Sequence, residues 1–200
     1  MLIEDVALKA AAQRPSALRR LAAWIVDYFI VAVYMGVLFF VSFLITGGRL
    51  RLDVLTTPGT RQLLGAVTLT LPVVVYFAIS EASTRQGTIG KLTTRLMVTD
   101  LSLRRISFGR SLVRSALKFL PWELAHTFVH RVPALGPIPG GALAALLASI
   151  ALASIYLVGL FGGQRRPVYD LIAGTRVVSR NIPERDSGTP IEAPVSRDGG

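Results

Sequence analysis

The sequence predicts an all-α membrane protein: a polytopic bundle of membrane helices with amphipathic helices on the cytoplasmic side. Apolar residues make up 52% of the 200 residues and charged residues only 17%, whereas soluble chains carry about 25% charged residues. The charges also lie between long apolar runs, and the net charge is +10. A basic surplus suits nucleic acid or an anionic membrane surface. Because the cations flank apolar runs, we expect the lipid bilayer and its anionic headgroups as partners, and no nucleic acid.

Three apolar runs predict three transmembrane helices, over residues 21–45, 63–79 and 141–161. The first has 25 residues and one charge, Asp27; the second has 17 and the third 21, both without a charge. A helix needs roughly 20 apolar residues to cross the hydrocarbon core. Three such runs in so short a chain could not all be hidden inside a soluble fold.

The distribution of Lys and Arg predicts the orientation, because cytoplasmic segments carry the excess of these residues. With three crossings the two sides are nearly balanced. A fourth crossing or re-entrant segment within residues 119–139 would place 18 of the 22 basic residues on one side. We therefore expect a multi-pass protein of the cell inner (cytoplasmic) membrane with both termini cytoplasmic.

The segment 83–131 between the second and third runs is amphipathic. Ile89, Leu92, Leu96 and Met97 follow helical spacing and predict a short helix over Gly87–Met97 in the headgroup layer. The run 87–91, Gly-Thr-Ile-Gly-Lys, lacks the spacing of a phosphate loop and the strand before it.

A second amphipathic helix is predicted to begin at Ser107, a suitable N-cap. We expect Pro121 to kink or restart this helix. Three cations, Arg110, Arg114 and Lys118, recur at every fourth residue and form a basic stripe. The side chains expected to contact lipid headgroups are Lys91, Arg110, Arg114 and Lys118.

Asp27 is the foremost candidate for a functional residue. A carboxylate within a membrane helix costs about 2.5–3.5 kcal/mol on insertion scales, so it needs a partner or a water-filled cavity. Arg20 lies seven residues earlier on the same face, too far for direct pairing, so a contact through water or from another helix is expected. Asp27 is either a proton or cation site or a structural anchor for the first helix.

Three further groups are candidates. Glu123, His126 and His130 share a helical face and could relay protons or bind a metal, or form the wet face of a half-inserted helix. Asp170 could bind an ion, cap a short helical turn, or pair with an arginine. Pro72 frees the carbonyl of Thr68, for cation binding or as a plain kink.

Small residues recur every four positions in the third run and predict a helix-packing face, within the chain or in a homo-oligomer. They are Gly141, Ala145 and Ser149. The apolar pieces Leu96–Thr99 and Arg176–Ser179 are predicted to pair as strands.

Three stretches together resemble the RDD family of bacterial membrane proteins, named for an arginine and two aspartates. They are Arg20-Leu-Ala-Ala-Trp-Ile-Val-Asp27, then Thr88-Ile-Gly-Lys91 leading to Asp100, and Asp170-Leu-Ile-Ala-Gly-Thr175 followed by Arg176-Val-Val178. The resemblance covers most of residues 17–180. It implies that Arg20, Asp27 and Asp170 are the signature residues, and that transport of an ion or small solute is the suspected activity.

The chain departs from the family pattern at three positions. Leu92 stands where an Arg is common, Arg95 where a small Gly is common, and Tyr169 where a His commonly precedes the last aspartate. The last departure weakens any mechanism that needs a His–Asp pair at that end.

We therefore expect a membrane domain over residues 1–180, followed by a disordered tail over 181–200 that is rich in proline, glycine and charge. The expected function is a transporter or exchanger of small ions or solutes, with Asp27 as the titrating residue; four membrane elements form a narrow path, so a homo-oligomer is expected. The alternative is a membrane scaffold with a basic cytoplasmic face. No motif indicates an enzyme, a cofactor or a metal.

Overall fold

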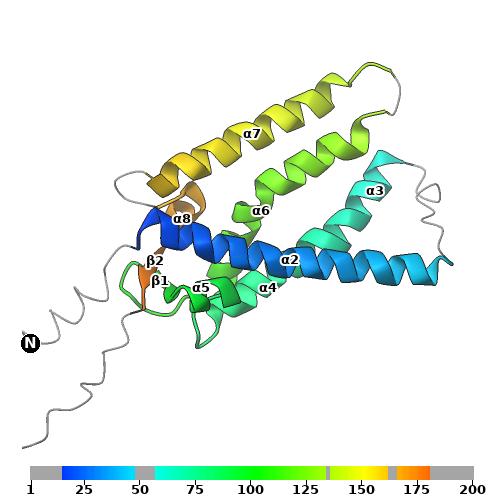
Figure 1. Ribbon diagram of the computed structural model, residues 1–200. Helices are drawn as coiled ribbons and strands as arrows, with labels where there is room; N and C mark the ends of the chain where they lie inside the picture. The colour runs from blue at the N-terminus through cyan, green and yellow to red at the C-terminus, as the bar shows by residue number, and fades with distance from the viewer. Residues whose placement is uncertain (1–14, 48–56, 134–135, 162–165, 181–200) are drawn as a thin grey trace, which may run out of the picture.

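A computed structural model describes residues 15–47, 57–133, 136–161 and 166–180 of the chain. The tail 181–200 lies outside these residues. Three helices are long and apolar enough to cross a membrane: α2 (Ala17–Ile45), the continuous helix Pro58–Ala82, and α7 (Gly140–Phe161). They confirm the three predicted membrane helices, and Figure 1 shows them in one elongated bundle.

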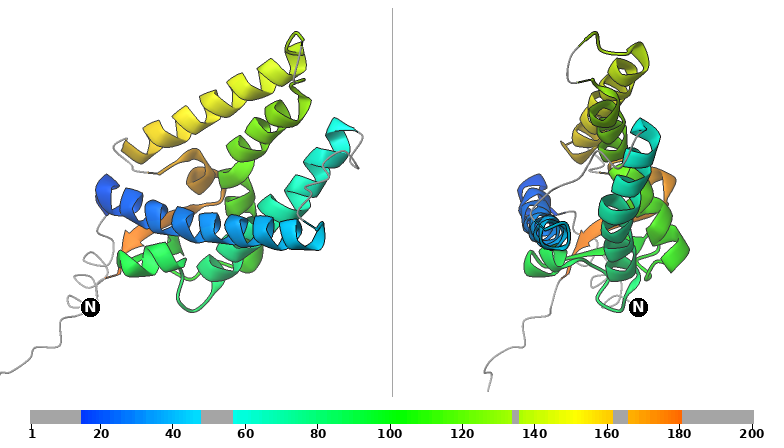
Figure 2. Two further views of the ribbon diagram at one scale, coloured as in Figure 1. Left: turned by 45° about the vertical axis from the view of Figure 1, so that its right-hand side comes forward. Right: turned by 90° about the vertical axis from the view of Figure 1, so that its right-hand side faces the viewer.

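A fourth long helix, α6 (Phe108–Arg131), lies beside α7 along its length and also packs on α4 (Leu71–Ala82) (Figure 2). Its 24 residues extend over about 36 Å, so it reaches from one end of the bundle to the other. Ser107 accepts a hydrogen bond from the Arg110 amide and caps the helix as predicted. α6 carries too many charges to count among the apolar spanning helices of the described chain.

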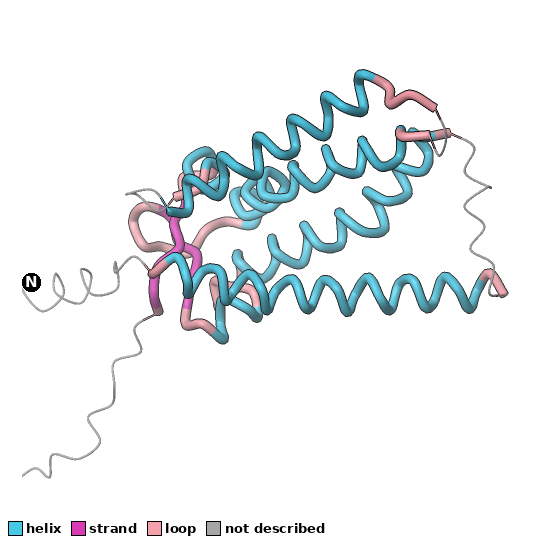
Figure 3. Tube along the Cα trace, turned by 45° about the horizontal axis from the view of Figure 1, so that its top comes forward, coloured by secondary structure: helices cyan, strands magenta, loops and turns pink. Residues whose placement is uncertain are grey.

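The four long helices alternate in direction. The start of α2 and the end of the last strand therefore lie at one end of the bundle, which we call the sheet end (Figure 3). The opposite end, where α2 ends and α7 begins, is the far end.

A two-stranded antiparallel sheet defines the sheet end. β1 (Leu96–Asp100) pairs with β2 (Thr175–Ser179), and Leu96 lies opposite Ser179. This confirms the predicted pairing of the two apolar pieces. The inner face of the sheet packs on the start of α2 in a small core made of Ala23, Leu96, Val98, Ile106 and Val177.

The predicted helix over Gly87–Met97 is wrong in its second half. The helix α5 spans only Ile89–Thr93, and Arg95 adopts a φ of 54° before β1 begins. A left-handed backbone ends a helix and is most readily adopted by glycine, which is the residue that the family pattern favours at this position. The amphipathic spacing continued past Thr93 because Leu96 and Val98 face the sheet core.

Each of the two helix-interior prolines has its freed carbonyl bonded by a tyrosine from a neighbouring helix. Pro72 follows a π-helical segment, η2 (Ala66–Thr70), which joins α3 (Pro58–Gly65) to α4. The hydroxyl of Tyr34 donates to the Thr68 carbonyl at 2.5 Å. This carbonyl is therefore engaged by the protein itself, which supports the plain-kink interpretation.

The second proline, Pro121, does not restart α6. The helix continues through it, and the hydroxyl of Tyr156 in α7 donates to the Leu117 carbonyl, four residues before the proline, at 2.7 Å. Ser149 of α7 donates to the carbonyl of Pro121 at 2.7 Å. The small-residue face thus packs on α6, but it consists of Ala142, Ala145 and Ser149. Gly141 is exposed in the single chain, so its place in a packing face, which would be a contact between copies of the chain, stays a prediction.

Candidate functional site

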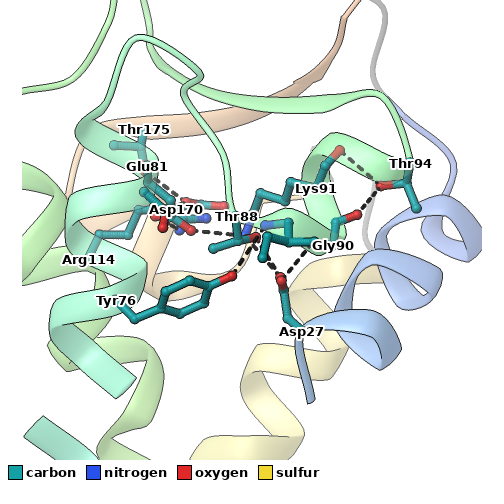
Figure 4. Close-up of polar contacts among 12 residues, drawn as sticks. Asp27, Tyr76, Glu81, Thr88, Gly90, Lys91, Thr94, Arg114, Asp170 and Thr175 are labelled. Carbon is teal, nitrogen blue, oxygen red and sulfur yellow. Dashed lines mark hydrogen bonds and ion pairs between the residues drawn. The ribbon is translucent and has the colours of Figure 1, made fainter. Parts of the chain in front are cut away.

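Five charged side chains of alternating sign form a buried network at the sheet end (Figure 4). Each comes from a different helix, namely α2, α5, α4, α6 and the short α8 (Val168–Ile172). In order along the network they are Asp27, Lys91, Glu81, Arg114 and Asp170. None is more than 7% exposed. Because burying a charge without a partner is very costly, the alternation of sign is what allows five charges to be buried together.

Asp27 is held by the segment that precedes and begins α5. Its Oδ2 accepts from the hydroxyl of Thr88 at 2.6 Å, and its Oδ1 accepts from the amide of Gly90 at 2.8 Å. The ammonium of Lys91 lies 3.9 Å from Oδ2. The predicted partner from another element is therefore present. The Gly-Thr-Ile-Gly-Lys run therefore surrounds the carboxylate of Asp27, and each of the two carboxylate oxygens accepts a hydrogen bond from it.

Gly90 is required for this approach. A Cβ at this position would lie 2.1 Å from the carbonyl oxygen of Ala23 and 2.8 Å from the Cγ of Asp27. Only a residue without a side chain lets α5 lie directly against the backbone of α2. The Thr-Ile-Gly-Lys run is thus a docking site for the first membrane helix.

Glu81, at the last turn of α4, is the centre of the network. It is fully buried; its Oε1 lies 2.9 Å from the Lys91 ammonium and its Oε2 lies 2.5 Å from the Nη1 of Arg114. Arg114 is itself almost fully buried and is held between the carboxylates of Glu81 and Asp170.

Asp170 completes the network from α8. Its Oδ1 accepts from the Nε of Arg114 and from the hydroxyl of Thr175, both at 2.7 Å. Its Oδ2 is buried and has no hydrogen bond or ion pair among the described residues. The helix cap is Pro167, so the capping role expected for Asp170 is wrong and its pairing with an arginine is confirmed. Burial and the adjacent Asp170 charge raise the pKa of Tyr169, which keeps its hydroxyl protonated.

The predicted headgroup contacts are corrected at two positions. Lys91 and Arg114 are buried in ion pairs, because the faces that carry them are turned toward Glu81 rather than outward. Arg110 is 47% exposed on its side chain and remains a candidate. Sequence reasoning missed Glu81 altogether. The available signal was an acid at the end of an apolar run, together with Arg114 between two small residues, Ser111 and Ser115, that are also buried.

Arg20 contacts the two-stranded sheet. Its Nη2 donates to the Val177 carbonyl of β2 at 3.1 Å, and the neighbouring Arg19 donates to the Ser179 hydroxyl at 3.1 Å and to the Thr94 carbonyl at 2.8 Å. The start of α2 is thereby fastened to both the end of the chain and the segment before β1.

Glu123, His126 and His130 lie on one face of α6 as predicted, but do not converge on an ion. His126 Nδ1 lies 3.6 Å from the Glu123 carboxylate, and the two imidazole centroids are 6.0 Å apart. Thr70 donates to Glu123 from η2. Within the part of the chain that the structure describes, no group of three His, Cys, Asp or Glu could hold a metal. This face packs on the helix formed by α3 and η2.

A cavity of about 340 Å³ adjoins the network, between α2 and the α6–α7 pair. Its walls are apolar and aromatic, and its charged lining residues are Arg20, Asp27, Lys91, Arg114, Lys118 and Asp170. Lys118 is distinctive, because its ammonium makes no hydrogen bond or ion pair with the described residues. It lies 3.7 Å from the ring centroid of Phe77 instead. The cavity therefore joins the buried network to a lysine that has no hydrogen bond or ion pair among the described residues.

The model of the RDD family matches residues 14–174. The chain belongs to the RDD family. No curated protein and no solved structure matches this RDD protein. Arg20, Asp27 and Asp170, which the resemblance implies as signature residues, all lie at the sheet end, where each fastens one part of the chain to another.

Proposed function

We propose that this RDD protein is a membrane transporter of a small solute and that the cavity beside the charge network is its substrate site. The observation that carries the proposal is the coincidence of this cavity with charges that are costly to bury. Charged residues among membrane helices are candidates for substrate and ion pathways, and a volume of about 340 Å³ lies in the range of small-molecule sites.

The site's charge favours an anionic solute over a cation at Asp27. Four cations and two carboxylates line the cavity. Both oxygens of Asp27 are already engaged by Thr88 and Gly90, so Asp27 acts as an anchor in this proposal. The cavity lies within one chain, so an oligomer is not needed to form it.

We also infer that the sheet end faces the cytoplasm of the inner membrane. The start of α2, the segment from α4 to the first half of α6, and the α8–β2 segment all lie there and hold thirteen of the fifteen Lys and Arg among the described residues. The other two, Arg61 and Arg131, lie near the far end, in α3 and at the last residue of α6. This asymmetry agrees with the positive-inside rule if α6 completes a fourth crossing.

A non-transporting scaffold is the second candidate, and the completeness of the Asp27 contacts favours it. A network in which nearly every charge is paired rigidifies the sheet end. A rigid basic surface is suitable for holding a partner protein or anionic lipids.

Flux in proteoliposomes separates the two functions. The gradients tested are sodium, proton, chloride and phosphate, and a fluorescent anionic phospholipid is followed between leaflets. Transport predicts that one of these moves faster than in protein-free vesicles, that Lys118→Gln slows it about tenfold, and that Arg110→Gln leaves it unchanged. If no tested species moves faster than in protein-free vesicles, the scaffold is supported instead.

A further inference from the structure

Part of the cavity wall is formed by side chains that are exposed along two membrane-spanning helices. Its walls include Leu21 and Trp24 of α2 and Leu157 of α7, and these side chains are 40%, 46% and 56% exposed. Both helices are long and apolar enough to span a membrane. α2 makes its main described contacts with α5, so its membrane-facing length is not closed against α7. A molecule can enter this site from the hydrocarbon layer.

The chemistry of the cavity changes along its length. The part nearer the far end is walled by Trp122, Ala125 and Ala153. The part nearer the sheet end meets the charge network and Lys118. A ligand that satisfies both parts has an apolar chain and an anionic group, because the lining carries more cations than carboxylates.

Aromatic side chains give the depth of the charged part. Both tryptophans of the chain, Trp24 and Trp122, line the cavity together with Tyr28, Tyr156 and Tyr169. Tryptophan and tyrosine concentrate where headgroups meet hydrocarbon. Lys118 lies nearer the sheet end than Trp122 does, while Ala125 and Ala153 line the part of the cavity nearer the far end.

We infer that the cavity binds one anionic phospholipid, with its phosphate at the Lys118 ammonium and one acyl chain between α2 and α7. This inference rests on the proposed function, since it names the class of molecule that the same cavity takes. A lysine near an anionic lipid surface contributes about 1 kcal/mol, which corresponds to about fivefold in affinity.

The test is lipid binding to the purified full chain, measured by native mass spectrometry with phosphatidylglycerol and phosphatidylcholine of identical acyl chains. The expected result is about fivefold preference for phosphatidylglycerol, lost in Lys118→Gln and kept in Arg105→Gln. Arg105 is the control because it lies just before α6, is exposed, and does not line the cavity. Thermal melting of each variant shows that it is folded.

A second variant tests the chain-binding part. Ala153 of α7 lines the cavity and is exposed, so Ala153→Trp should reduce retention of both phospholipids by filling the space. Soluble glycerol phosphate should not displace the bound lipid.

Four outcomes overturn the inference: equal binding of the two lipids by the wild type, equal losses in Lys118→Gln and Arg105→Gln, displacement by glycerol phosphate, or a dimer without lipid that Ala153→Trp abolishes. Transport failure is distinguishable, because binding without movement of any species removes the proposed function and leaves the site. Flux of an inorganic ion without a lipid preference would support the proposed function and overturn the phospholipid site.

Discussion

Two polar clusters lie among the helices of this protein, and they are built in opposite ways. In the network at the sheet end, five charges of alternating sign come from five helices, pair with one another and are almost fully buried. In the Glu123 cluster, the closest charged neighbours come from the same helix, and the side chains of Glu123 and His126 are 25% and 20% exposed. Regular spacing produced the second cluster, whereas only the tertiary fold produced the first. Complementary charge from different elements is therefore the better sign of a site that the fold depends on.

The largest expected effect comes from removing the central cation of the network. Arg114→Leu leaves Glu81 and Asp170 buried without their shared partner, so it should destabilise the fold by about 3–5 kcal/mol. Denaturant unfolding in detergent measures this. Arg110→Leu, four residues earlier and exposed, should change stability by less than about 0.5 kcal/mol. Equal losses of unfolding free energy in the two variants would show that the buried network stabilises the fold no more than an exposed arginine does.

The next effect tests the close approach of α5 to α2. Gly90→Ala places a methyl group against the Ala23 carbonyl and Asp27, and overpacking of this kind costs about 1–3 kcal/mol. Gly36→Ala is the control in α2, because nothing lies within 4 Å of its added Cβ. The thermal midpoint should fall for the first variant and stay or rise slightly for the second.

A smaller effect is expected where tyrosines bond the carbonyls freed by proline. Tyr156→Phe removes the hydroxyl from the Leu117 carbonyl, and Tyr34→Phe does the same at Thr68. An acceptor left unsatisfied costs about 1–3 kcal/mol, and the lower end applies because both sites are only partly buried. Wild-type stability in both variants would show that water replaces the hydroxyl at no cost.

The smallest effect is expected in the Glu123 cluster. His126→Ala and His130→Ala should each change stability by no more than about 0.5 kcal/mol, and added zinc should not shift the melting temperature of the wild type. A zinc-dependent rise in the melting temperature that disappears in both variants would show that this cluster is an ion site.

The sequence by itself determined the membrane class, the three apolar spans and the cap at Ser107, and it identified the two apolar pieces that form strands. These follow from local properties, namely run length, side-chain spacing and capping residues, whereas the pairing of the two pieces is a contact between residues far apart in the chain. The sequence also indicated that Asp27 needed a partner, because the cost of burying a carboxylate does not depend on knowing the fold.

Only the tertiary structure decided which charges meet. The positions of Lys91 and Arg114 in the sequence predict side chains that face lipid headgroups. Both side chains instead point inward and pair with Glu81, which no sequence pattern identified as a candidate. Pairing between residues far apart in the chain depends on how α4, α5, α6 and α8 converge at the sheet end. That convergence requires the glycine at position 90 and the sheet that joins the two ends of the domain, and neither effect is visible in the sequence of any one helix.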